Sequence, residues 1–407
     1  MILFMYMKMV NDKQKIKTLL TRAVSSAIVR EHLEKRLNSG EKLRVKFGID
    51  PTAPDIHLGH TVPLLKLRQF QNLGHQAILI IGDFTARIGD PTGRIKAREL
   101  LSESEVKKNL KTYLGQISKI IDIKKTEIHH NTEWFGKMSV RNFFELVGKI
   151  TVQQILKRED FKKRIKNDTD ITTNEVMYPL FQGYDSVMAR ADVEIGGEDQ
   201  LLNLLMGRRI QRACNIPEQN ILTTWLIEGT DGTKKMSKSS GNYIGITEKP
   251  NIIFGKIMSI PDSLIIKYFR ALTTITDAEI DKFEMELKSK KINPRDIKNK
   301  LAYEIVKMYF GERGAEEAGE EFNRVFRKHE PPKKMPVAAL KKGFYDAPDL
   351  LLKLNLVKSK SEARRLINEN AVKIDGGAVE DPKTKISATS GLVVQIGKKR
   401  FVKIEIK

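Results

Sequence analysis

The 407-residue sequence has almost no cysteine, and its apolar stretch at the amino end is short. Cys214, the single cysteine, can form no disulfide within the chain and belongs to no cysteine-pair metal motif, so we expect a small core residue in a reducing cytoplasm. Residues 1–7 are apolar but lack a basic leader and a small-residue cleavage site, and they are far too few to span a bilayer. We therefore expect neither export nor membrane anchoring.

Acidic residues are too few to balance the basic ones. The chain has 72 Lys and Arg against 51 Asp and Glu, which gives a formal charge of +21 and an isoelectric point near 9.7. A cationic surface attracts polyanions because binding releases the counterions that condense on phosphates. Nucleic acid is therefore the leading partner class, although a solvated surface from a lysine-rich proteome explains the charge almost equally well.

The first part of the chain has the pattern of an α/β domain, and its 40% apolar content excludes a disordered or fibrous chain. Residues 43–49 and 76–81 are predicted strands, the second a run that is apolar on both faces, as in a buried parallel strand. A helical pattern at 61–73 joins them into a right-handed βαβ unit. Strand patterns recur at 193–195 and 221–227, with helices between them.

We therefore predict a Rossmann-like parallel-sheet catalytic domain over residues 1–245, opened by an amphipathic helical region to about residue 37. Its ligands should bind at the carboxyl ends of the strands. Residues 252–327 are helical and highly charged, which predicts an all-α domain over residues 246–328.

The end of the chain is predicted to be a separate small domain. Residues 329–348 are rich in proline and poor in periodicity, which predicts a linker. Residues 349–407 are predicted to form a small α+β domain, in which Ser359 caps a helix that ends near Asn370. Its predicted strands are residues 371–374, 392–396 and 401–406.

Two histidines follow the first predicted strand. The sequence His57-Leu-Gly-His60 directly precedes a helix, whose amino end favours anions. Gly59 would let a flat base or a ribose approach the backbone. When the two histidines are considered without other motifs, a metal-binding or packing role explains them as well as ligand binding does.

A lysine-containing loop favours the functional interpretation. Residues 235–239 read Lys-Met-Ser-Lys-Ser and lie in a loop rich in Gly, Ser, Thr and Lys after the strand ending near residue 227. A flexible loop with two lysines can close on a triphosphate and neutralise the charge that develops on the transferring phosphoryl group. A lysine-rich loop by itself is usually only solvated, but this one follows the histidine pair in an α/β frame.

The histidine and lysine motifs together resemble the HIGH and KMSKS signatures of the class I aminoacyl-tRNA synthetases. Further motifs narrow the resemblance to tyrosyl-tRNA synthetases of the bacterial type over nearly the whole chain. These motifs begin at Gly48 (Gly-Ile-Asp-Pro-Thr-Ala), Ile88 (Ile-Gly-Asp-Pro-Thr-Gly), Tyr178 (Tyr-x-x-x-Gln-x-x-Asp) and Gly196 (Gly-Gly-Glu-Asp-Gln).

A polar stripe on a predicted helix fits the same substrate. Tyr178, Gln182 and Asp185 fall on one helical face, where a core helix would normally be apolar. A surface helix is the alternative, but the flanking apolar residues favour burial, and buried polar groups need partners. Pro179 either starts this helix or kinks it.

The resemblance assigns roles to residues at matching positions. Tyr178, Gln182 and Asp90 would hold the tyrosine ammonium group, Gln200 the reacting tyrosine, and Asp185 the phenol hydroxyl, with Asn131 lining that pocket. The implied ATP-binding set is Asp50, Thr52, Gly59, His60, Arg94, Arg98, Gly196, Asp199, Lys235, Met236, Ser237 and Lys238. Asp199 could also be an ordinary helix cap.

Lys46 departs from the family pattern. One branch of the family places a tyrosine there that hydrogen-bonds the substrate phenol. Either Asp185 and other groups hold the hydroxyl here, or Lys46 supplies a donor of its own.

The last domain resembles a small RNA-binding domain shared with a ribosomal protein and pseudouridine synthases. Residues 349–407 contain 13 Lys and Arg but only 7 Asp and Glu, a net charge of +6. The predicted tRNA contacts are Lys358, Lys360, Arg364 and Arg365. A charged, solvated helix remains the alternative.

The resemblance implies that tyrosine is activated with ATP and then transferred to its tRNA. Because the tyrosine carboxylate arrives ionised, catalysis would be positioning and charge stabilisation, assigned to His57, His60, Lys235 and Lys238. Mg²⁺ would come with ATP, without a dedicated protein metal site. A homodimer is implied by the family alone. The rival hypotheses are a tryptophanyl-tRNA synthetase, an adenylyltransferase and a non-catalytic RNA-binding paralogue.

Overall fold

The computed structural model divides the chain into two compact units, Met1–Gly311 and Glu312–Lys407. The residues it describes are 12–93, 101–327, 330–332, 335–397 and 400–407. Within this described part, no helix has both the length and the apolar character needed to cross a membrane.

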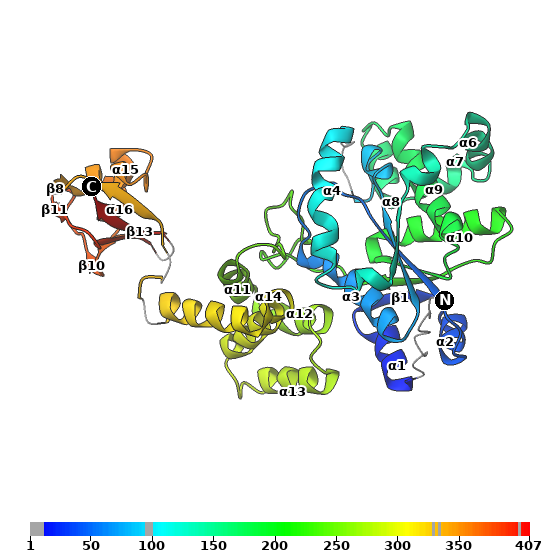
Figure 1. Ribbon diagram of the computed structural model, residues 1–407, viewed down its shortest axis with the longest axis horizontal. Helices are drawn as coiled ribbons and strands as arrows, with labels where there is room; N and C mark the ends of the chain where they lie inside the picture. Colours follow the sequence, from blue (N-terminus) through cyan, green and yellow to red (C-terminus); the bar gives the residue numbers. More distant parts are fainter. Residues whose placement is uncertain (1–11, 94–100, 328–329, 333–334, 398–399) are drawn as a thin grey trace, which may run out of the picture. The chain divides into compact units, whose positions relative to one another are not determined.

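A six-stranded sheet forms the centre of the first unit (Figure 1). The five strands from β6 to β4 are mutually parallel, whereas β1 pairs antiparallel with β6 at one edge. In spatial order the strands are β1 (Val24–Ile28), β6 (Asn220–Thr224), β5 (Val193–Gly197), β2 (Arg44–Ile49), β3 (Gln76–Ile81) and β4 (Thr126–His130). The predicted parallel sheet is confirmed, and its βαβ unit is β2, α3 and β3.

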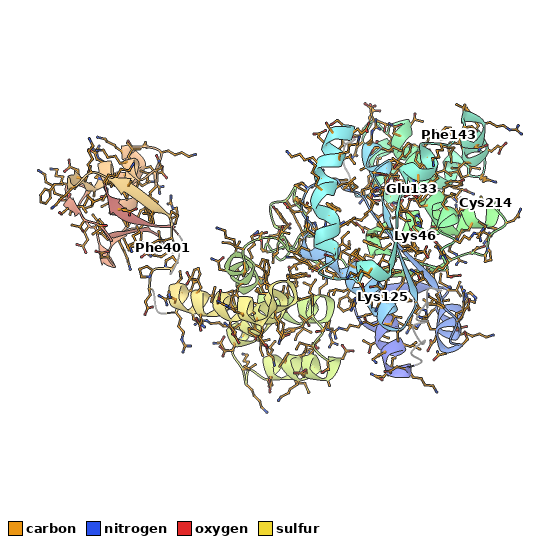
Figure 2. The ribbon with its side chains drawn as sticks, in the orientation of Figure 1. Lys46, Lys125, Glu133, Phe143, Cys214 and Phe401 are labelled. Atoms are coloured by element: carbon orange, nitrogen blue, oxygen red, sulfur yellow. The ribbon has the colours of Figure 1, made fainter. Side chains whose placement is uncertain are left out.

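Helices pack around this sheet, and α3 and α10 contact several of its strands. The helices are α1 (Lys13–Thr21), α2 (Arg30–Asn38), α3 (Leu58–Asn72), α4 (Glu103–Ile117), α5 (Thr132–Phe135), α6 (Val140–Val147), α7 (Val152–Leu156), α8 (Glu159–Lys166), α9 (Thr173–Met188) and α10 (Leu201–Ala213). Short 3₁₀ turns occur at Thr85–Arg87, Ile123–Lys125 and Glu198–Gln200. Two apolar clusters pack against α9, and the partly buried Cys214 lies at the edge of one of them (Figure 2).

Two strands of the sheet were not predicted. The amino-terminal region, predicted as helical to residue 37, contains β1 between α1 and α2, because Ser26 bonds to Thr223 and completes the edge of the sheet. β4 is only half-buried and has the polar sequence Thr-Glu-Ile-His-His. It therefore contains no apolar run that could mark it as a strand. Sheet edges are stabilised by backbone pairing, which leaves little trace in local sequence.

A helical region follows β6 and continues past Gly311, the last residue of the first unit. The prediction of helices without strands over residues 252–327 is confirmed. Its helices are α11 (Pro250–Met258), α12 (Ile265–Leu272), α13 (Asp277–Lys288) and α14 (Pro294–Phe326), with a 3₁₀ turn at Asp262–Leu264. Gly311 interrupts α14 with a φ of 77°, in the left-handed region that glycine adopts without strain. The Arg22 side chain donates hydrogen bonds to the carbonyls of Phe269, Arg270 and Thr273, and so joins α12 to the α/β part.

The second unit has its own apolar core, which includes Leu350, Ile367, Val394 and Ile404. Its five-stranded sheet has the order β10 (Gly377–Ala378), β9 (Val372–Ile374), β12 (Val393–Ile396), β13 (Arg400–Ile406) and β7 (Val337–Leu340). Its other elements are β8 (Gly343–Asp346), which pairs with β11 (Lys385–Ala388), and the helices α15 (Ala347–Lys353) and α16 (Lys360–Asn368).

The predicted linker over residues 329–348 is wrong in its second half. β7 pairs with β13, and β8 pairs with β11, so this stretch belongs to the small domain. These strands have four residues each and pair with strands about 40 to 65 positions further along the chain. These strands are therefore stabilised by pairing with distant strands, and not by an alternation of apolar residues that could be seen in the local sequence.

Candidate active site

A cavity of about 320 Å³ opens at the carboxyl ends of β2, β3, β5 and β6, where ligands were expected in a parallel sheet. Most of the predicted site residues line it. The lining includes Asp50, Thr52, His57, Gly59, His60, Asp90, Tyr178, Gln182, Asp185, Gly196, Asp199, Gln200, Lys235, Met236 and Ser237. Arg94 and Arg98 lie outside the described residues.

The two histidines lie at the amino end of α3. The helix begins at Leu58, three residues earlier than predicted, and the His57 and His60 rings stack with centroids 3.6 Å apart. Burial, reinforced by Lys238 and Lys235, lowers the pKa of His57 to about 3. Burial also holds the pKa of His60 well below its usual value, with His57 as the next cause. Both imidazoles are therefore neutral near pH 7.

Neutral imidazoles suit hydrogen bonding to a ligand. Nδ1 of His57 is buried and has no hydrogen-bond partner among the described residues. Gly59 leaves the ring edge clear, because a Cβ at that position would lie 3.1 Å from the His57 ring. An orphaned polar atom beside an open backbone marks a place where a bound molecule can complete the pairing.

The lysine loop is tied to the histidine motif through the backbone. The Leu58 N–H donates to the carbonyl of Ile244 at 2.9 Å, and the Ile246 N–H donates to the carbonyl of Ile56 at 2.9 Å. Asn242 orders the loop itself, since its Oδ1 accepts the Ser237 N–H at 2.9 Å. The two motifs, far apart in sequence, thus form one wall of the site.

The two lysines of the loop have different partners. Lys235 lines the cavity and forms an ion pair with Asp199. Lys238 does not line the cavity, and its Nζ donates to the carbonyl of Asp55 at 2.5 Å. Burial lowers the pKa of Lys238. A polyphosphate entering the site would therefore have to compete with Asp199 for Lys235.

The polar stripe predicted on a helix lies on α9 and faces the cavity. Pro179 lies inside this helix rather than at its start. The Tyr178 hydroxyl donates to Oδ2 of Asp50 at 3.0 Å, and Asp50 also accepts from the Thr85 hydroxyl at 2.8 Å. Gly82 is needed beside this pair, because a Cβ there would lie 1.9 Å from Oδ1 of Asp50.

Asp185 lies at the buried end of the stripe. Its two carboxylate oxygens accept from Trp134 Nε1 at 2.9 Å and from Asn131 Nδ2 at 3.4 Å. Burial raises the pKa of Asp185 to about 7, and Lys46 is the largest opposing influence. Asn131 does not line the cavity, and it contacts Asp185 through the hydrogen bond from its Nδ2.

Lys46, which the sequence assigns to the tyrosine pocket, does not line the cavity, and its ammonium is paired within the protein. Its Nζ forms an ion pair with Glu194 at 2.9 Å, and both side chains are 1% exposed. The same Nζ donates to the Ser186 hydroxyl at 2.7 Å and to the Gln182 carbonyl at 3.0 Å. These three partners use all the N–H groups of an ammonium.

Several residues at the site carried no recognisable sequence signal. Trp134 contacts Asp185 on a segment distant in sequence, whereas Asn242 contacts residues of its own loop through a side-chain geometry that sequence alone does not show. Glu194 lies in register with Lys46 on the neighbouring strand β5, so this pair follows from strand order rather than from local sequence.

The predicted tRNA-binding residues lie on or next to α16 in the second unit, and all four are exposed. Lys360 forms an ion pair with Asp349 at 2.5 Å, and Arg365 pairs with Glu369 at 2.8 Å. Exposed pairs of this kind are weak and can exchange for a phosphate.

Known proteins resemble this chain over nearly its whole length. Residues 38–327 match the family model "tRNA synthetases class I (W and Y)", and residues 328–404 match "Tyrosine--tRNA ligase SYY-like C-terminal domain". The tyrosine–tRNA ligase of Thermotoga maritima is 48% identical, with 95% of this chain and 96% of the relative covered. That of Aquifex aeolicus is 47% identical, with 93% and 95% covered.

Solved structures support the fold of the first part of the chain. A truncated mitochondrial tyrosyl-tRNA synthetase of Coccidioides posadasii is 23% identical with a TM-score of 0.62, covering 75% of this chain and 91% of that one. The Archaeoglobus fulgidus tyrosyl-tRNA synthetase, complexed with L-tyrosine, is 19% identical with a TM-score of 0.60, covering 75% and 99%.

Proposed function

Since the chain belongs to the class I tyrosyl-tRNA synthetases and is a tyrosine–tRNA ligase, we propose that the cavity beside α3 and α9 performs both steps of its reaction. Tyrosine, ATP and tRNA are its substrates. Family membership removes the tryptophanyl, adenylyltransferase and non-catalytic alternatives. One observation supports the location: the histidine motif, the lysine loop and the polar stripe of α9 meet in one cavity.

In the first step, a carboxylate oxygen of tyrosine attacks the α-phosphorus of ATP, and the bond to the bridging oxygen of pyrophosphate breaks. No protein base is needed because the carboxylate is already ionised. We assign charge stabilisation to Lys235 and Lys238, and hydrogen bonding to the neutral His57 and His60. Mg²⁺ would arrive on the triphosphate and neutralise part of its charge. In the second step, the terminal ribose hydroxyl of tRNA attacks the activated carbonyl and releases AMP.

The ATP-binding residues are proposed from their places in the cavity wall. Gly59 and Gly196 leave room for the base and ribose, and Asp199 would accept from ribose hydroxyls once Lys235 turns to the phosphates. The other proposed contacts are Asp50, Thr52, Met236 and Ser237. Arg94 and Arg98 keep their proposed role at the pyrophosphate.

Tyrosine would lie along α9. Asp185 accepts a hydrogen bond from the phenol hydroxyl at the buried end. The ammonium and carboxyl end is faced by Tyr178, Gln182, Asp90 and Gln200.

We also propose roles for the parts of the chain. Residues 1–245 carry this chemistry, and the helical region contacts tRNA near its anticodon. The enzyme acts in the cytoplasm.

The direct test of the site is ATP–pyrophosphate exchange. The full chain should catalyse exchange that depends on tyrosine and not on tryptophan, followed by transfer to tRNA for tyrosine. A cavity variant such as His60→Ala should lose exchange while retaining its thermal stability. Full exchange activity in this variant would place the chemistry elsewhere.

The same assays test the division of labour between the two units. A chain ending at Arg327 should retain tyrosine-dependent exchange, because every proposed substrate contact of the first step precedes Gly241. Transfer to tRNA should fall, since the lost residues 328–407 would supply phosphate contacts. Affinity of the full enzyme for tRNA should decrease by roughly 0.9 log units per log unit of salt for each duplex phosphate neutralised.

Truncation should flatten that salt dependence. The matched full-length control is a variant with Lys358, Lys360, Arg364 and Arg365 replaced by Gln, which keeps the domain but removes its proposed contacts. If both proteins aminoacylate with the salt dependence of the full chain, the second unit does not anchor tRNA, and the helical region must do so.

We propose a homodimer formed through α6, α7 and α8. Val140, Phe144, Val152 and Ile165 on these helices are 73%, 67%, 57% and 56% exposed, which is unusual for large apolar side chains in one short stretch. Phe144→Glu should therefore convert a dimer into a monomer at micromolar concentration in sedimentation velocity. Phe344→Glu is the matched control, because Phe344 is 76% exposed but lies in the other unit. A wild-type monomer, or an unaffected dimer in Phe144→Glu, would contradict the proposed surface.

A further inference from the structure

Asp90 and Gln200, two lining residues of the cavity, are held by a network that begins between them. Gln200 Nε2 donates to Oδ2 of Asp90 at 2.8 Å. The other carboxylate oxygen, Oδ1, accepts from the Thr92 hydroxyl at 2.6 Å and from the Thr92 N–H at 2.9 Å. Both oxygens of Asp90 are therefore fixed in orientation before any ligand binds.

Arg158 closes this network into a ring, although it does not line the cavity. Its Nη2 donates to the Thr92 hydroxyl at 2.9 Å, and its Nη1 donates to Oδ1 of Asn203 at 2.7 Å. Asn203 in turn donates from Nδ2 to Oε1 of Gln200 at 2.8 Å. Five side chains thus form a closed circuit from Asp90 through Thr92, Arg158, Asn203 and Gln200.

The ring fixes the direction of each group in it. Because Asn203 Oδ1 accepts from Arg158, its Nδ2 must face Gln200, and Gln200 must then present Nε2 to Asp90. Removing Arg158 would take away a hydrogen bond from both Thr92 and Asn203, so the side chains that hold Asp90 and Gln200 would gain freedom to shift. A small loss of orientation in a binding group weakens the interactions that depend on it.

Arg158 is itself firmly held. It caps the amino end of α8, is 4% exposed, and forms two hydrogen bonds to Asp160 at 2.9 and 3.1 Å. Its guanidinium also lies over the Phe161 ring, 5.2 Å from the centroid. Because Asp160 balances its charge, Arg158 can orient Asp90 without a strong net repulsion of a cation in the cavity.

We propose that Arg158 is a positioning residue for the amino group of bound tyrosine, acting through the ring that orients Asp90 and Gln200. This inference rests on the proposed function, in which Asp90 and Gln200 face the ammonium end of tyrosine. It adds a residue at the amino end of α8 that touches no substrate.

The test compares two inhibitors that differ only in the amino group, tyrosinol and 3-(4-hydroxyphenyl)propan-1-ol. Their inhibition constants are measured against tyrosine in ATP–pyrophosphate exchange. Arg158→Met should raise the constant for tyrosinol about tenfold and change that for the deamino alcohol less than about twofold, because only the first ligand uses Asp90. The KM for ATP should stay close to that of the full-length wild type.

Two further variants separate orientation from charge and from folding. Arg158→Lys keeps the ion pair with Asp160 but cannot reach both Thr92 and Asn203, so it should behave like Arg158→Met. Thr92→Val breaks the ring on the opposite side and should produce a smaller loss of the same kind. Equal losses for both inhibitors, or no loss for either in folded variants, would overturn the role of Arg158.

Asp90→Asn distinguishes failure of this inference from failure of the proposed function. If Asp90→Asn weakens tyrosinol selectively and Arg158→Met does not, Asp90 contacts the amino group and Arg158 does not position it. If Asp90→Asn affects both inhibitors equally, the assignment of Asp90 to the amino group is itself wrong, and the inference fails with it.

Discussion

Replacing Asp185 by asparagine is expected to reduce the preference for tyrosine over phenylalanine by at least about 100-fold, because the buried carboxylate is the proposed acceptor for the phenol hydroxyl. Trp134 and Asn131 each donate to one oxygen of Asp185. An asparagine would turn an amide N–H towards one of these donors, so the side chain could no longer occupy the same position. Tyrosyl-tRNA synthetases are themselves the reference case for such a site, with discrimination of about 10⁵.

The pH dependence of tyrosine binding gives a second measure of the same interaction. Burial raises the pKa of Asp185 to about 7, so the carboxylate becomes a full acceptor only as the pH rises through that value. Tyrosine affinity should therefore increase between about pH 6 and pH 8, whereas phenylalanine affinity should change little. The step should be absent in Asp185→Asn.

The measurement is kcat/KM for exchange with each amino acid, in wild type and variant, with the KM for ATP as the control. Tyr178→Phe is the matched comparison, since it alters another residue of the same helical stripe away from the phenol. A preserved selectivity ratio in folded Asp185→Asn would mean that the hydroxyl is recognised elsewhere. Lys46 would not be the replacement, because its ammonium is fully used by Glu194, Ser186 and the Gln182 carbonyl.

The fold was predictable where the signal is local. β3 is a continuous apolar run, and α9 places three polar residues on one face, so both could be recognised without knowing their neighbours. β1, β4, β7 and β8 could not be recognised in this way. Each is short or polar, and each depends on strands that are distant in sequence.

The site was predictable to the same extent. Motif residues were found because their type and spacing are characteristic, whereas Trp134, Asn203 and Arg158 act through contacts that only the folded chain creates. Lys46 shows the limit most clearly. In a strand buried on both faces, residue type does not reveal which side a lysine faces, and its partner Glu194 is set by strand order.

Lys238→Ala is expected to lower kcat for ATP–pyrophosphate exchange by about 10²- to 10³-fold while changing the KM for tyrosine only slightly. In the free enzyme, Lys238 Nζ donates to the Asp55 carbonyl rather than lining the cavity. Its contribution to substrate binding should therefore be small until the loop moves towards the phosphates. An interaction formed mainly in the transition state affects kcat more than KM.

Lys234→Ala is the matched control for this prediction. Lys234 precedes Lys235 in the same loop, is exposed, and does not line the cavity, so its replacement removes the same charge from the same segment. If loss of net positive charge alone weakens catalysis, both variants should be impaired equally. If Lys238 stabilises the charge that develops on the leaving pyrophosphate, only Lys238→Ala should lose kcat. An unchanged kcat in Lys238→Ala would show that this lysine does not act in tyrosine activation, and Lys235 would then have to supply that charge after it leaves Asp199.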